Sequence, residues 1–293
     1  MTFKEKYINP FTDFGFKKLF GTEPNKDLLI NFLNDVILPQ QKKVADLSYR
    51  KNEYIGHTEM DRKAVFDLYC ISPSGERFIV EMQKAKQNYF KDRSVFYSTF
   101  PIQEQAQAGD WNYRLSAVYT VGILDFAFNE DSKSNLTKEV RHEVQLKNQK
   151  GDVFYDKLTF VYLEMPHFNK SEDELETTYD KWLFVLKHLP NLTERPQKLQ
   201  ERIFQRLFEA AEIAKFSHEE KEQYEESLKS YRDLKNVIDT AFDEGEAKGK
   251  EERATEIVSN MLKKGLPIDL IGEITELPSD VIMRLKENLG LDE

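Results

Sequence analysis

The sequence predicts an α/β protein in which helices cover a β-sheet, followed by an α-helical C-terminal region. Residues 63–85 alternate between apolar and polar side chains around a turn, which is typical of a β-hairpin. Residues 115–126 form a nearly continuous apolar run, which suits a strand that is covered on both faces. From residue 171 onward the composition shifts towards helix formers. These observations place the sheet before the helical region.

The turn of the hairpin sets its register. Residues 72–75 read Ser-Pro-Ser-Gly, which matches a three-residue loop whose Gly75 takes a left-handed conformation. If the residues that flank this loop face each other, Asp67 lies opposite Glu81, whereas a slip of one residue would put Glu81 on the other face. The alternation also predicts a packing face, which is expected to contain Ala64, Phe66, Leu68, Cys70, Phe78, Val80 and Met82.

This register brings two carboxylates together. Like charges directly across a ladder destabilise it. A divalent cation removes the penalty, because Mg²⁺ is bound by oxygen ligands from one or two carboxylates. We therefore hypothesise that Asp67 and Glu81 bind Mg²⁺ or Mn²⁺. The alternative is a sheet edge whose charges are simply solvated.

The composition limits the partners and the location. A net charge of −10, from 42 basic and 52 acidic residues, gives no general attraction to nucleic acid, so any contact with DNA must be local. The single cysteine, Cys70, excludes an intramolecular disulfide and indicates a buried thiol in a reducing compartment. Residues 1–10 lack the apolar segment of a signal peptide, and no stretch approaches the roughly 18 apolar residues of a membrane span. We expect a cytoplasmic protein without membrane contact.

Before the hairpin, the sequence predicts a capped helix and one strand. Either Thr12 or Asp13 caps the helix, and Asp13 is the favoured N-cap. Residues 44–55 are expected to form a strand beside the hairpin.

After the hairpin, a helix is predicted at residues 88–108. Arg93 and Tyr97 are four positions apart and therefore share one face of it. Arg93 is expected either to contact a phosphate or to pair with Asp92 or Glu104 on the surface.

The C-terminal region is predicted to be helical throughout, apart from one junction. A capping box at residues 171–174 begins a helix, and residues 199–216 and 219–242 form two more. Residues 243–250 are expected to form a flexible, charged junction. The tail is similar in spacing to a helix-turn-helix with Ser279 as an N-cap, and its few basic residues favour packing or oligomerisation over base recognition. The predicted domains are a core at 1–168, a helical extension at 169–243 and a small helical tail at 244–293.

Two segments carry a family resemblance. Residues 66–83 contain Asp67, a turn and then Val-Glu-Met-Gln, and residues 9–21 read NPFTDFGFKKLFG. Together with the helix that carries Arg93, they resemble the Rpn family of recombination-promoting nucleases and transposases, in the PD-(D/E)XK nuclease superfamily. The likeness is good over residues 7–125 and loose beyond them.

The resemblance implies a restriction-endonuclease-like mixed sheet flanked by helices, and metal-dependent cleavage of DNA phosphodiesters. Asp67 and Glu81 would match the metal ligands, and Gln83 the catalytic position that holds lysine in the wider superfamily. A neutral amide can orient a water or a phosphate oxygen but supplies no positive charge. The residues expected to contact the substrate are Lys63, Lys84, Arg93, Tyr97 and Asp13, the last of which could also be a secondary ligand.

Two functions follow from these expectations. The first is a Mg²⁺- or Mn²⁺-dependent DNA endonuclease linked to recombination or mobile elements. The second is a catalytically inactive module that keeps the nuclease fold and binds nucleic acid or protein. A homodimer, in which two sites would cut two strands, is a further hypothesis.

Overall fold

The computed structural model of the chain describes residues 5–38, 43–51, 53–54, 64–106, 109–128, 139–275 and 277–290. Its contacts divide the chain into two units, Met1–Arg232 and Asp233–Glu293. The division into three domains expected from the sequence stays a prediction.

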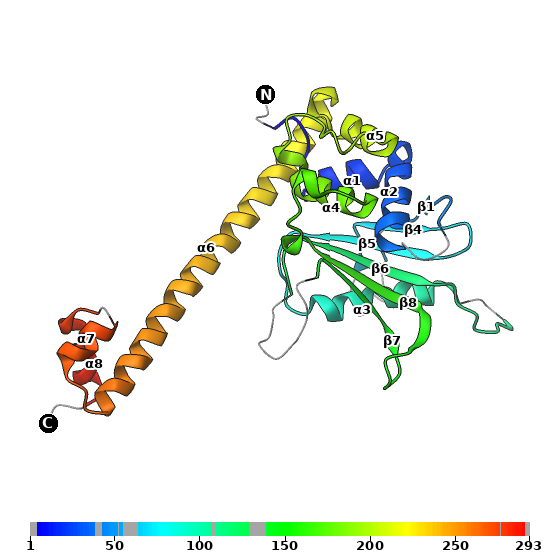
Figure 1. Ribbon diagram of the computed structural model, residues 1–293. Helices are drawn as coiled ribbons and strands as arrows, with labels where there is room; N and C mark the ends of the chain where they lie inside the picture. The colour runs from blue at the N-terminus through cyan, green and yellow to red at the C-terminus, as the bar shows by residue number, and fades with distance from the viewer. Residues whose placement is uncertain are drawn as a thin grey trace. The chain divides into compact units, whose positions relative to one another are not determined.

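The first unit is organised around a mixed six-stranded sheet (Figure 1). Its order is β1-β4-β5-β6-β8-β7, and a separate two-stranded ribbon pairs β2 with β3. The segment at 44–55 was wrongly predicted as one strand, because it forms the short strands β1 and β2, of which only β1 pairs with β4. The strands are β1 (Ser48–Tyr49), β2 (Glu53–Tyr54), β3 (Ala64–Val65), β4 (Leu68–Ile71), β5 (Arg77–Gln83), β6 (Val118–Leu124), β7 (Arg141–Lys147) and β8 (Val153–Glu164).

The three central strands run parallel. β6 pairs with β5 on one side and with β8 on the other, so that Val121 lies between Val80 and Val161. Every residue of β6 is buried, which confirms the expectation from its apolar run. The outer pairs β1–β4, β4–β5 and β7–β8 are antiparallel, so the predicted mixed sheet is confirmed.

Helices cover both faces of this sheet (Figure 1). One face packs against α1, α2, α4 and α5, with Trp182 at the centre and its ring 5.9 Å from Phe20 and 5.3 Å from Phe204. The other face packs against α3, where Ile79 lies in one cluster with Tyr97. The helices of this unit are α1 (Asp13–Phe20), α2 (Lys26–Phe32), α3 (Phe90–Gln103), α4 (Thr178–His188), α5 (Arg202–Ala211) and the beginning of α6 (His218–Lys263).

The hairpin has the register that its turn predicts. Leu68 pairs with Val80, and Gly75 has a φ of 92° in the closing turn. The packing face is as predicted except at Phe66, which lies with Ile79 on the α3 side. The strict alternation fails there because the chain bends between β3 and β4. The side chain of Ala64 lies outside the described part of the structure.

Two helices begin elsewhere than the sequence favoured. The Thr12 hydroxyl caps α1 by accepting a hydrogen bond of 3.0 Å from the backbone N–H three residues later. Asp13 is not the N-cap: it is the first helical residue, and its carboxylate forms an ion pair with Lys17 at 2.9 Å. The capping box at 171–174 exists but begins a single 3₁₀ turn, and α4 starts after a second capping box at Thr177.

The second unit consists of the rest of α6 with α7 (Ile268–Thr275) and α8 (Ser279–Asn288). Val258, Leu262, Ile271 and Ile282 form its core. Ser279 is not an N-cap, because α8 already includes it and Pro278 precedes the helix. Across the described ranges, none of the helices combines the length and the apolar character that crossing a membrane requires.

The prediction of a flexible junction at residues 243–250 is wrong, because α6 continues through these residues. Gly245 and Gly249 each cost a helix about 1 kcal/mol relative to alanine. The neighbouring glutamate, alanine and lysine residues are strong helix formers. An ion pair of 2.6 Å between Lys250 and Glu246 adds to the helical state.

Candidate active site

The site lies where β4 begins. β3 leaves the main sheet to pair with β2, so the chain bends at Asp67 instead of continuing along β5. The Asp67 carboxylate takes the place of a ladder carbonyl, because its Oδ2 accepts a hydrogen bond of 2.7 Å from the backbone N–H of Met82. Where β4 and β5 separate in this way, there is room for a carboxylate at this end of the sheet.

Hydrogen bonds join the three residues predicted to be catalytic. Glu81 Oε1 lies 3.3 Å from the backbone N–H of Asp67, which donates to it. Glu81 Oε2 accepts a hydrogen bond of 3.1 Å from the side-chain amide of Gln83. Both acidic residues therefore lie at the end of the hairpin away from its turn, Asp67 directly before β4 and Glu81 on β5.

Burial makes the charge of this pair costly. Glu81 is 5% exposed, and burial together with the Asp67 charge raises its pKa from 4.5 to about 8. Burial also raises the pKa of Asp67, against the effect of the hydrogen bond from Met82. Without a cation, burial and the repulsion between the two charges therefore favour a protonated form of the pair.

Positive groups lie around the pair on both sides of the sheet. Lys17 and Lys84 lower the pKa of Asp67, and the Arg93 guanidinium lowers that of Glu81. Burial lowers the pKa of Lys84 itself. These cations thus partly offset the effect of burial, which raises the pKa of both carboxyl groups. The same cations could also bind a phosphate.

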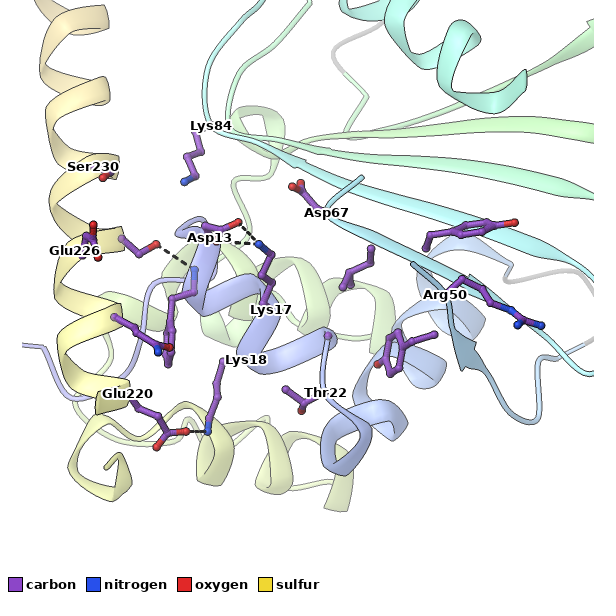
Figure 2. A pocket seen from close by; sticks show the side chains of 17 residues that line it. Asp13, Lys17, Lys18, Thr22, Arg50, Asp67, Lys84, Glu220, Glu226 and Ser230 are labelled. Carbon is purple, nitrogen blue, oxygen red and sulfur yellow. Dashed lines mark hydrogen bonds and ion pairs between the residues drawn. The ribbon is translucent and has the colours of Figure 1, made fainter. Parts of the chain in front are cut away.

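Asp67 opens into a pocket of about 790 Å³ between α1, β4 and the first turns of α6. Figure 2 shows Asp67, Lys84 and the ion pair of Asp13 with Lys17 around the same space. On its far wall Lys18 is held by Glu220 at 2.5 Å. Asp13 is not the helix cap, but it lies near Asp67, and its negative charge raises the pKa of Asp67.

Arg93 and Tyr97 approach Glu81 from α3. The Arg93 guanidinium lies 5.1 Å from the centre of the Phe90 ring and 5.6 Å from that of Tyr97, and it donates to the side chain of Gln87. Burial raises the pKa of Tyr97, and the Glu81 charge adds to this effect. The predicted shared face of Arg93 and Tyr97 is thus present, and the predicted partners Asp92 and Glu104 do not bind Arg93 among the described contacts.

Sequence reasoning left Arg50 out of the expected site and left the role of Lys17 open. Lys17 was expected either to reach a phosphate or to be solvated, and it lines the pocket four residues after Asp13 on the same helix. Arg50 also lines the pocket, and no sequence motif points to it. Lys63, which was expected to contact the substrate, lies outside the described residues.

A mixed sheet between two helical layers, with an acidic pair at the end of its central hairpin, defines the class of PD-(D/E)XK nuclease folds. The chain belongs to the PD-(D/E)XK nuclease family transposases, whose family model matches residues 10–241. The resemblance expected from the sequence is confirmed, and the match extends through β8, α4 and α5. No curated protein and no solved structure gave a match. Membership of this family supports a nuclease role associated with mobile elements.

Proposed function

We propose that this protein is a DNA endonuclease that hydrolyses phosphodiester bonds with the help of a divalent cation. The observation that carries the proposal is the hydrogen-bonded group of Asp67, Glu81 and Gln83 at the parting of β4 and β5. A buried acidic pair on two strands is unfavourable for stability and is typical of a catalytic site. The family to which the chain belongs supports the same conclusion.

The donor set fits Mg²⁺ or Mn²⁺. In the described part of the chain no three histidine, cysteine or acidic side chains gather in a metal site, but Mg²⁺ needs only one or two carboxylates and keeps several waters. Asp67 and Glu81 would hold it, since a double positive charge offsets the burial that raises both pKa values. When bound, such a cation supplies Lewis-acid polarisation of a phosphate oxygen and lowers the pKa of water.

The other residues would bind and orient the substrate. Gln83 holds Glu81 through its amide N–H, and its amide oxygen can accept a hydrogen bond from the attacking water. Lys84 supplies the positive charge that Gln83 lacks, and a bound phosphate would offset the burial that lowers the Lys84 pKa. Arg93 would contact a phosphate near Glu81, and Asp13 and Tyr97 would lie beside the substrate.

Nicking of supercoiled plasmid DNA in the presence of Mn²⁺ or Mg²⁺ tests this function. We expect Asp67→Asn and Glu81→Gln to reduce nicking by about 100-fold or more, because metal-ion polarisation contributes several kcal/mol to the transition state. Asp156→Asn is the matched control, since Asp156 is an exposed aspartate on β8 of the same sheet.

Equal nicking by Asp67→Asn and Asp156→Asn would refute the assignment of the site. An absence of nicking with every divalent cation would instead favour the inactive module that Gln83 in place of lysine suggests. The homodimer, the link to recombination and the cytoplasmic location stay predictions.

A further inference from the structure

The start of α3 lies at the same end of the sheet as the acidic pair. β5 and β6 are parallel and α3 connects them, so the helix runs back from the end of β5 towards the beginning of β6. The far end of the helix is tied there, because Gln105 accepts a hydrogen bond of 2.7 Å from the backbone N–H of Ser116. Tyr89, Arg93, Phe96 and Tyr97 form what we call the α3 face.

The α3 face combines three aromatic rings with one cation. Tyr89 is 80% exposed and Phe96 is 46% exposed. Between them, the Arg93 guanidinium lies against the Tyr97 ring. Its positive charge lowers the pKa of Glu81. The backbone N–H of Arg93 donates to the carbonyl of Tyr89, so Tyr89 lies one helical turn before Arg93 at the start of α3.

Tyr89 adopts a backbone conformation that is unusual for its residue type. Its φ is 61°, in the left-handed region that residues other than glycine rarely occupy. Two exposed lysines, Lys86 and Lys91, flank it in the sequence. An exposed ring with a lysine on either side of it in the sequence, at the end of the sheet that carries Glu81, is suited to a planar and negatively charged ligand.

We propose that the α3 face binds unpaired nucleotides beside the cleaved phosphodiester, so that the substrate is single-stranded or locally unpaired DNA. This inference rests on the proposed endonuclease function and names its substrate class. Proteins bind single strands by stacking bases on aromatic rings along a basic surface. In a duplex, the faces of the bases are stacked on one another, so an aromatic ring on a helix surface has no base to contact.

Binding without cleavage tests the inference. Fluorescence anisotropy would compare a labelled thymidine oligonucleotide of about 20 nucleotides with a hairpin duplex in EDTA, since several bases must be free to stack. Tyr89→Asn removes the ring, and asparagine tolerates left-handed backbone. Tyr113→Asn is the matched control: Tyr113 has a φ of 58° and is 79% exposed, but it precedes β6 at the opposite end of the sheet.

We expect the protein to prefer the single strand and Tyr89→Asn to weaken its binding by about fivefold or more, as for the loss of one stacked base. Tyr89→Phe should retain the affinity, and Tyr113→Asn should not change it. Equal affinities for single strand and duplex, or equal effects of Tyr89→Asn and Tyr113→Asn, would overturn the inference.

The two proposals fail in different ways. If plasmid nicking is absent but single-strand binding depends on Tyr89, the endonuclease function is refuted and the α3 face stands. If nicking depends on Asp67 but single-strand binding does not depend on Tyr89, the endonuclease function stands and the proposed role of the α3 face is refuted.

Discussion

Removing the charge of Glu81 should make the metal-free protein more stable at alkaline pH. The folded state raises the pKa of this carboxyl from 4.5 to about 8. Between these values the folded protein holds a proton that the unfolded chain has released, so the free energy of unfolding falls as the pH rises through this window. At about 1.4 kcal/mol per pH unit, the total loss between pH 4.5 and 8 is at most about 5 kcal/mol.

Glu81→Gln replaces the carboxyl by a neutral group of the same shape and should therefore abolish this loss. Thermal unfolding in EDTA between pH 5 and 8.5 measures it. A difference of about 5 kcal/mol corresponds to about 10–20 °C in Tm for a unit as large as Met1–Arg232. Glu209→Gln, at an exposed position of α5, is the control.

Mn²⁺ should reverse the pattern. It should raise the Tm of the native protein at pH 8 but leave Glu81→Gln nearly unchanged, because a bound ligand stabilises only the state that binds it. Parallel pH profiles for the native protein and Glu81→Gln in EDTA would refute the assignment of a strained, buried carboxyl to this position.

Three further changes have defined outcomes. Thr12→Ala removes the N-cap of α1 and should lower the free energy of unfolding by about 1 kcal/mol in a urea titration; no change would mean that the cap contributes nothing. Gly249→Ala should stabilise α6 by about 0.5–1 kcal/mol in thermal unfolding followed by circular dichroism, because a Cβ there meets nothing within 4 Å, and a loss of helix would contradict this. Lys84→Gln should reduce the slope of log K against log salt for DNA binding by about one. Lys18→Gln should not, since Glu220 already holds Lys18, and equal slopes for both variants would remove Lys84 from the phosphate site.

The parts of the fold that were predictable depend on local rules. The turn at residues 72–75 favours a three-residue loop, so the register of β4 against β5 followed from its sequence. The apolar run of β6 followed from burial on both faces. The register of the hairpin then predicted that Asp67 and Glu81 lie at the same end of it.

The unpredicted parts depend on competition between interactions. Phe66 changes face because the chain leaves the sheet at Asp67, and alternation holds only while a strand continues. Thr12 and not Asp13 is the N-cap of α1, because the Thr12 hydroxyl accepts the hydrogen bond from the helix N–H. The Asp13 carboxylate pairs with Lys17 instead. The approach of α6 to the pocket joins residues more than 200 positions apart, such as Lys18 and Glu220, and no local pattern encodes that contact.

The turn at 72–75 and the acidic pair lie at opposite ends of the same two strands. Surface turns usually tolerate insertions and deletions. Here, one added residue would exchange the inward and outward sides of β4 and carry Asp67 away from its partner. The tip between β7 and β8 has no such constraint, because irregular pairing at Gln145–Lys147 already absorbs a shift. Length variation among descendants of this chain should therefore accumulate at the second tip and be purged from the first.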